Sequence, residues 1–133
     1  MGFYGKVLIV EDKRWRSKKE IEKALEGYKE IRLFWTDKEH AMAVLSKISD
    51  IAICILDACT GKNKMQSTVA LAEKILKVFH GKIKIIVMSC TAPTRVPLMV
   101  AGCHYECSKG NLAQTLIEVL ELDQPVIGWQ MKY

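Results

Sequence analysis

The sequence predicts an α/β domain with a five-stranded parallel sheet that is doubly wound, so that helices cover both of its faces. Short apolar runs rich in β-branched residues alternate with segments whose apolar residues recur at helical spacing, and this alternation repeats five times. The runs are apolar at successive positions, as expected for parallel strands buried on both faces. A chain of 133 residues, 50% of them hydrophobic, has room for one such domain.

The expected strands are short and regularly separated. They cover residues 6–10, 31–35, 51–56, 84–88 and 105–108, of which the last is the weakest. A helical segment follows each strand, so consecutive strands are expected to lie parallel and to be joined by helical crossovers.

Several helix starts carry capping residues. Caps are predicted at Thr36 or Asp37, at Ser67 or Thr68, and at Asn111. The fourth helix differs, because Pro93 and Pro97 restrict it to a short piece before Gly102.

The chain is expected to form one domain over residues 1–122, followed by a tail at 123–133. No apolar run approaches the roughly 18 residues that a membrane span needs, and the residues before the first strand are too few for a signal peptide. We therefore expect a cytoplasmic protein.

The five cysteines include no CxxC pair, which favours a reducing compartment over a disulfide scaffold. Cys54 lies inside an apolar run and is expected to be buried. Cys103, His104 and Cys107 could be read as zinc ligands, but three ligands without a partner cluster are weak evidence for a metal site.

The net charge of +5 comes in part from the stretch KRWRSKK at residues 13–19. The simplest interpretation is a solvated helix start, and a contact for phosphate or an acidic partner is the alternative. A single short cluster is poor evidence for nucleic-acid binding, which we do not expect.

Four of the expected strands end beside residues able to hold a cation or a phosphate group. These residues are Glu11, Asp12, Asp57, Ser89 and Lys109. Ligands of open α/β sheets bind beyond the carboxyl ends of the strands, so the five residues are expected to converge there.

Carboxylates at close range repel one another unless a cation holds them, and Mg²⁺ takes one or two carboxylates together with phosphate oxygens. An aspartate at such a site can act as a nucleophile towards a phosphoryl group, while the metal and Lys109 neutralise the developing charge.

The pattern resembles the receiver domains of two-component response regulators, including the single-domain chemotaxis type. The matching segments are residues 7–12 (VLIVED), 55–57 (ILD), 87–89 (VMS) and the stretch from Ala101-Gly102 to Lys109. The resemblance covers about residues 6–122, and it implies a flavodoxin-like (βα)5 fold with strand order 2-1-3-4-5.

The resemblance implies a Mg²⁺ site. Asp12 and Asp57 would bind the ion directly, Glu11 would act through water, and the backbone carbonyl of Cys59 would be a further ligand.

The resemblance also implies a phosphoacceptor. Asp57 would accept the phosphoryl group from a histidine kinase or phosphotransfer protein, Lys109 would pair with it, and Ser89 would be the switch hydroxyl. The expected function is a stand-alone phosphorelay switch that changes its affinity for a downstream protein. Such a protein is not an enzyme beyond self-phosphotransfer and autodephosphorylation, and a monomer or weak homodimer is expected.

Three positions depart from the family pattern. Gly110 stands where proline usually follows the lysine, and Cys90 stands where a very small residue usually follows the switch hydroxyl. Glu106 takes the place of the usual aromatic, while Tyr105 lies one position earlier and so faces the other side of its strand. These departures favour an alternative, a pseudo-receiver that acts as an interaction module without phosphorylation.

A metal-dependent nucleic-acid enzyme of the Toprim kind is a further alternative, since it also places a glutamate after a first strand and an acidic residue after a later one. That family needs a second aspartate two residues after this acidic residue. Two residues after Asp57, this chain has Cys59.

Overall fold

A computed structural model of the chain describes residues 4–11, 18–28, 30–60 and 66–124. The strands are β1 (Tyr4–Val10), β2 (Glu30–Thr36), β3 (Ile51–Asp57), β4 (Cys59–Thr60), β5 (Gln66–Ser67), β6 (Lys84–Ser89) and β7 (Tyr105–Ser108). The helices are α1 (Lys18–Ala24), α2 (Ala41–Lys47), α3 (Val69–Val78), α4 (Ala92–Ala101) and α5 (Leu112–Gln124), with a 3-10 helix η2 (Lys109–Asn111) before α5.

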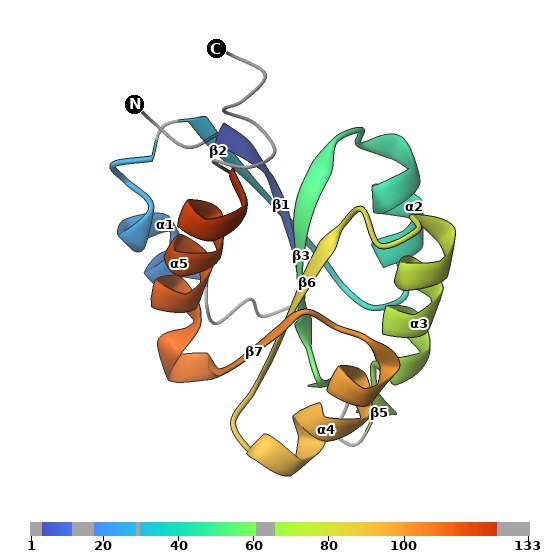
Figure 1. The fold of residues 1–133 in the computed structure, drawn as a ribbon. Helices are drawn as coiled ribbons and strands as arrows, with labels where there is room; N and C mark the ends of the chain where they lie inside the picture. Colours follow the sequence, from blue (N-terminus) through green and yellow to red (C-terminus); the bar gives the residue numbers. More distant parts are fainter. Residues whose placement is uncertain (1–3, 12–17, 29, 61–65, 125–133) are drawn as a thin grey trace.

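The main sheet has five parallel strands in the order β2-β1-β3-β6-β7. Strands β4 and β5 pair with each other in an antiparallel ladder of their own. Counted over the main sheet alone, the order is therefore 2-1-3-4-5, and the predicted fold class is confirmed. Figure 1 shows α1 and α5 on one face of the sheet and α2 and α3 on the other.

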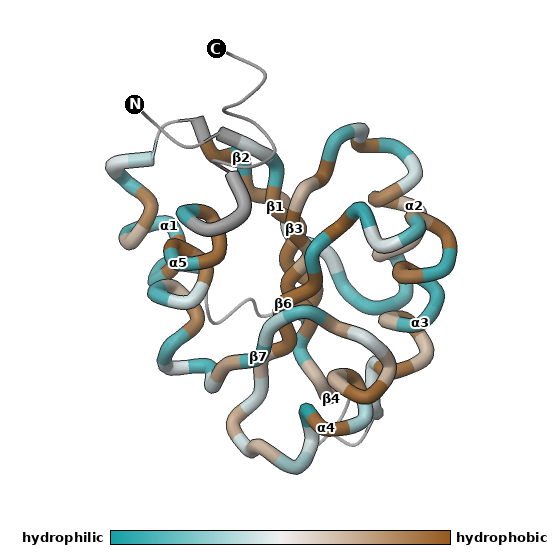
Figure 2. Tube along the Cα trace, viewed as in Figure 1, coloured by the Kyte–Doolittle hydropathy of each residue, from teal (hydrophilic) through white to brown (hydrophobic). Residues whose placement is uncertain are grey.

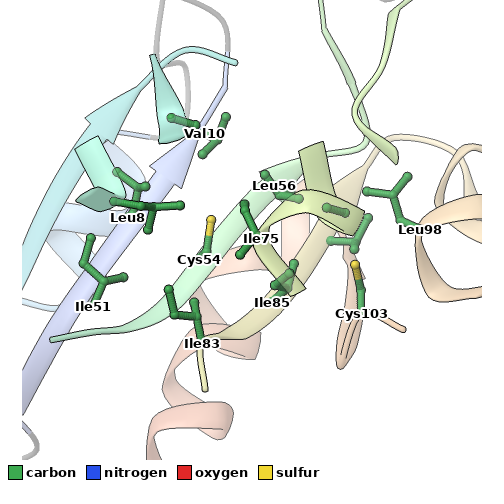
Figure 3. Packing of buried hydrophobic residues seen from close by; sticks show 14 of the residues in the cluster. Leu8, Val10, Ile51, Cys54, Leu56, Ile75, Ile83, Ile85, Leu98 and Cys103 are labelled. Carbon is green, nitrogen blue, oxygen red and sulfur yellow. The ribbon is translucent and has the colours of Figure 1, made fainter. Parts of the chain in front are cut away.

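Each face of the sheet has its own hydrophobic core, because successive side chains of a strand point to opposite faces. In β3, Cys54 and Leu56 pack towards α2 and α3, whereas Ile53 and Ile55 pack towards α1 and α5. Figure 2 shows that the central strands are hydrophobic along much of their length, and Figure 3 shows the core on the α3 side. Cys54 is fully buried there, as predicted.

Helix α4 corrects the prediction of a short fourth helix, since it runs for ten residues. Pro93 lies in the first turn, where backbone N–H groups have no partner within the helix, so it costs little. Pro97 lies inside the helix and removes one backbone hydrogen bond, while the next residue, Leu98, is fully buried in the core. Gly102 ends the helix at φ 116°, a conformation that glycine adopts readily.

Other helix starts also differ from the prediction. The cap predicted at Thr36 or Asp37 is wrong in position, because Thr36 ends β2 and α2 begins only at Ala41, with His40 as its N-cap residue. The Asp37 carboxylate accepts a hydrogen bond from the His40 N–H at 2.9 Å in the turn before the helix. Thr68 is the N-cap residue of α3, one of the two positions predicted. Asn111 belongs to η2, immediately before α5.

Helix α5 continues to Gln124, two residues beyond the predicted domain boundary at 122, and residues 125–133 of the predicted tail lie outside the described residues. In the part of the chain that the structure describes, none of the helices has the length and apolar character needed to cross a bilayer.

Candidate functional site

The carboxyl ends of four strands gather the predicted site residues at one edge of the sheet. Glu11 follows β1 directly, Asp57 ends β3, Ser89 ends β6, and Lys109 follows β7. The register pairs Val10 with Leu56, so Glu11 and Asp57 leave neighbouring strands at the same level. The structure thus brings these four predicted residues together.

The other two predicted metal ligands are Asp12 and the backbone carbonyl of Cys59. Asp12 lies outside the described residues. Cys59 begins β4, directly beyond the edge, and its backbone N–H donates to Asp57 Oδ1 at 3.3 Å.

The Asp57 carboxylate is 2% exposed and is contacted at both of its oxygens. The Lys109 ammonium lies 3.0 Å from Oδ2, and the Cys59 N–H donates to Oδ1. A cation and a donor offset the cost of burying a charged carboxylate. Lys109 is 31% exposed, so its ammonium lies between the carboxylate and solvent.

Thr68 holds the backbone on either side of this carboxylate. Its hydroxyl donates to the Asp57 carbonyl at 2.7 Å and lies 3.2 Å from the Ala58 carbonyl oxygen. The Thr68 N–H donates to the same Ala58 carbonyl at 3.0 Å. The Ala58 N–H in turn donates to the Met88 carbonyl of β6 at 2.8 Å. Thr68 is fully buried and was predicted only as a helix cap, because nothing in its spacing from Asp57 signals the contact.

The described part of the site fits Mg²⁺. Glu11 and Asp57 are both buried and supply carboxylate oxygens, the ligands that this ion prefers. Within the described ranges, no three His, Cys, Asp or Glu side chains form a metal-binding group, and the third predicted carboxylate, Asp12, lies outside those ranges.

The zinc interpretation of Cys103, His104 and Cys107 does not fit the structure. Cys103 packs in the core on the α3 side, whereas Cys107 packs in the core on the α5 side. Burial raises the pKa of the Cys103 thiol to about 11 and also raises the pKa of Cys107, which disfavours the thiolate that zinc binds.

The Ser89 hydroxyl is directed towards α4. It donates to the Thr91 carbonyl at 2.6 Å and accepts from the Thr94 hydroxyl at 2.7 Å. Because a hydroxyl has only one proton to donate, Ser89 must leave Thr91 before it can donate to a group on Asp57.

Arg95 of α4 contacts both neighbouring strand ends, although the sequence analysis gave it no role. Its Nη1 donates to the carbonyls of Ser89 and Cys107, each at 2.9 Å, and its Nε donates to Glu106 Oε1 at 3.0 Å. Arg95 lies between two prolines in a segment without helical periodicity, so no sequence signal identified it.

The three departures from the family pattern are all visible. Tyr105 packs against the core on the α5 side, whereas Glu106 pairs with Arg95 of α4, so the two side chains face opposite sides of β7 as predicted. Cys90 is exposed directly after Ser89, and Gly110 lies within η2.

Comparison with solved structures shows that the fold is the receiver-domain fold of response regulators. The non-phosphorylated receiver domain of the stress response regulator RcsB from Escherichia coli matches with a TM-score of 0.74 at 18% identity, over 91% of this chain and 93% of that one. A two-component response regulator from Clostridium difficile matches with a TM-score of 0.70 at 14% identity, over 90% of this chain and 98% of that one.

A longer relative in fold is the RcsB response regulator of Salmonella typhimurium, with a TM-score of 0.73 and 18% identity. The match covers 91% of this chain but only 60% of that protein. No protein-family model and no curated protein matches the chain. The predicted resemblance is therefore confirmed in the fold.

Proposed function

We propose that the chain is a Mg²⁺-dependent phosphoacceptor, in which Asp57 receives a phosphoryl group and the phosphorylated form changes its affinity for a protein partner. One observation carries the proposal: a buried carboxylate at the shared edge of the sheet has a lysine ammonium at 3.0 Å and a backbone N–H on its other oxygen. This arrangement suits an oxygen nucleophile whose product is a phosphate anion.

The reaction would begin with attack of an Asp57 carboxylate oxygen on the phosphorus of a phosphohistidine. The P–N bond breaks, its electron pair remains on the imidazole nitrogen, and an acyl phosphate forms on Asp57. The Lys109 ammonium is close enough to neutralise the added charge, and the Ser89 hydroxyl can donate to a phosphoryl oxygen once it turns from Thr91. Attack of water on the phosphorus would later break the P–O bond to Asp57, release inorganic phosphate and return the free carboxylate.

Mg²⁺ would be held by Asp12, Asp57 and the Cys59 carbonyl, with Glu11 acting through water. When bound, the ion supplies positive charge that the clustered carboxylates and the phosphoryl oxygens share.

The phosphodonor would be a histidine kinase or phosphotransfer protein, and the output a docking event with a downstream protein. We assign this role to residues 1–122 and treat residues 123–133 as a tail that the chemistry does not need. A monomer or weak homodimer suffices, because every proposed site residue comes from one chain.

The test is binding of beryllofluoride, which mimics an aspartyl phosphate, in the presence of Mg²⁺. Tryptophan fluorescence and amide NMR shifts should change saturably with Mg²⁺ and again with beryllofluoride, and Asp57→Asn should abolish the second change while the variant stays folded. If Asp57→Asn responds as the natural protein does, Asp57 is not the acceptor.

A phosphorylation-independent interaction module is the second candidate. The observation that favours it is the orientation of Ser89, whose hydroxyl is bonded to Thr91 and Thr94 of the α4 region. This candidate predicts that beryllofluoride leaves the NMR spectrum unchanged at every Mg²⁺ concentration.

A further inference from the structure

The Arg95 guanidinium joins the ends of two neighbouring strands. Met88 pairs with Cys107 and Ser89 with Ser108, which are the last pairs of the β6–β7 ladder. One terminal nitrogen, Nη1, carries two protons and donates to the carbonyls of both Ser89 and Cys107. Arg95 therefore links the two strand ends at the point where the ladder stops.

Glu106 fixes the guanidinium in this position. Its carboxylate accepts from Arg95 Nε at 3.0 Å, and the Arg95 side chain is only 12% exposed. A planar guanidinium with three hydrogen bonds has a defined orientation, unlike a lysine ammonium on a flexible stem.

These two strand ends deliver the groups that would contact a phosphoryl group on Asp57. The Ser89 carbonyl belongs to the residue with the proposed switch hydroxyl, and Cys107 lies two residues before Lys109. Gly110 follows Lys109 within η2, and an added Cβ there would meet no atom within 4 Å.

We infer that Arg95 is a positioning residue that sets the spacing of Ser89 and Lys109 across the phosphoryl site. This inference rests on the proposed function. Arg95 contacts neither Asp57 nor the proposed metal ligands among its hydrogen bonds, and it acts through the two backbone carbonyls that it holds.

The experiment measures beryllofluoride affinity and Mg²⁺ affinity separately. Arg95→Ala should weaken beryllofluoride binding about tenfold, which corresponds to about 1.4 kcal/mol, and should leave Mg²⁺ binding within about twofold. Arg32→Ala is the matched control, because Arg32 is an exposed arginine in the first half of β2. It should change neither affinity.

Two further sets of variants separate positioning from general destabilisation. Arg95→Lys keeps the charge and one donor group and should recover part of the lost affinity. In Ser89→Ala and Lys109→Ala backgrounds, the effect of Arg95→Ala should fall to about twofold or less, because residues that act through one another are not additive. Circular dichroism and thermal unfolding identify any variant that fails to fold, in which case Arg95→Lys carries the test.

The outcomes distinguish this inference from the proposed function. If the natural protein binds no beryllofluoride at Asp57, the proposed function fails and the role of Arg95 fails with it. If the natural protein binds and Arg95→Ala binds equally well, only the role of Arg95 is overturned. An equal loss of Mg²⁺ and beryllofluoride affinity, or an undiminished loss in both backgrounds, would show a purely structural effect and would also overturn it.

Discussion

The ends of β3 and β6 are neighbours in the sheet, yet their functional side chains are held in different ways. At the end of β3, Asp57 meets Lys109 and the Cys59 N–H, and Thr68 fixes the backbone behind it. At the end of β6, the Ser89 hydroxyl is bonded away from this group, towards residues of the α4 region. The surroundings of the proposed acceptor, Asp57, are therefore already in place, whereas the hydroxyl of Ser89 would have to rotate before it could contact a group on Asp57.

The largest effect is expected from removing the ion pair between Lys109 and Asp57 at the end of β3. Lys109→Ala removes the ammonium 3.0 Å from Asp57 and should weaken beryllofluoride binding by about 1.5–3 kcal/mol, a typical value for a hydrogen bond to a charged group. Mg²⁺ binding should persist. Paired titrations of Mg²⁺ and beryllofluoride followed by NMR measure both.

Lys82→Ala is a suitable control for that variant, because Lys82 is exposed in the turn before β6. Unchanged beryllofluoride affinity in Lys109→Ala would mean that the ion pair has no part in binding the phosphoryl group.

A smaller effect is expected at the support behind Asp57. Thr68→Val keeps the shape of the fully buried side chain but removes the hydroxyl that donates to the Asp57 carbonyl at 2.7 Å. The free energy of unfolding should fall by about 1–2 kcal/mol, since the buried carbonyl loses this donor. Urea denaturation measures the loss, and Thr68→Ser, which keeps the hydroxyl, should retain more of the stability than Thr68→Val.

The smallest perturbation is chemical labelling of cysteines, which needs no change in the sequence and compares a buried thiol of β3 with an exposed thiol just after β6. Cys90 follows Ser89 and is exposed, whereas Cys54 of β3 is fully buried. The thiolate is the reactive form, and burial raises the pKa of Cys54 and raises that of Cys103 to about 11. At pH 8 a thiol reagent should therefore modify Cys90 well before Cys54 or Cys103.

Mass spectrometry of peptides after timed labelling gives the three rates, with the unfolded protein as reference. As the pH rises towards 11, Cys103 should gain reactivity, because its thiol begins to ionise. Similar labelling rates for Cys54 and Cys90 at pH 8 would contradict the buried packing of β3.

The local pattern of apolar and polar residues predicts much of the fold and the edge of the sheet where the candidate site residues lie. Continuous apolar runs that end on Asp57 and Ser89 predicted strand ends that the structure places within one residue, because burial on both faces leaves little choice of residue within such strands. The fourth helix is longer than the sequence predicts. Pro93 occupies the first turn, where its missing N–H costs little, and the hydrogen bond that Pro97 removes is offset by the burial of Leu98.

The sequence alone shows acidic, hydroxyl and basic residues directly after the expected strands. It also predicts that they meet at one edge of the sheet, because strands joined by helical crossovers are parallel and have their carboxyl ends at the same edge. Three contacts are visible only in the folded chain: Lys109 reaches Asp57, Ser89 is bonded to Thr94, and Arg95 joins Ser89 to Cys107. The physical reason is that these contacts depend on side-chain direction and on the packing of α4 against the sheet. The pattern of apolar residues along the chain predicts which face of an element is buried, but it specifies neither the rotamer of a polar side chain nor the placement of α4.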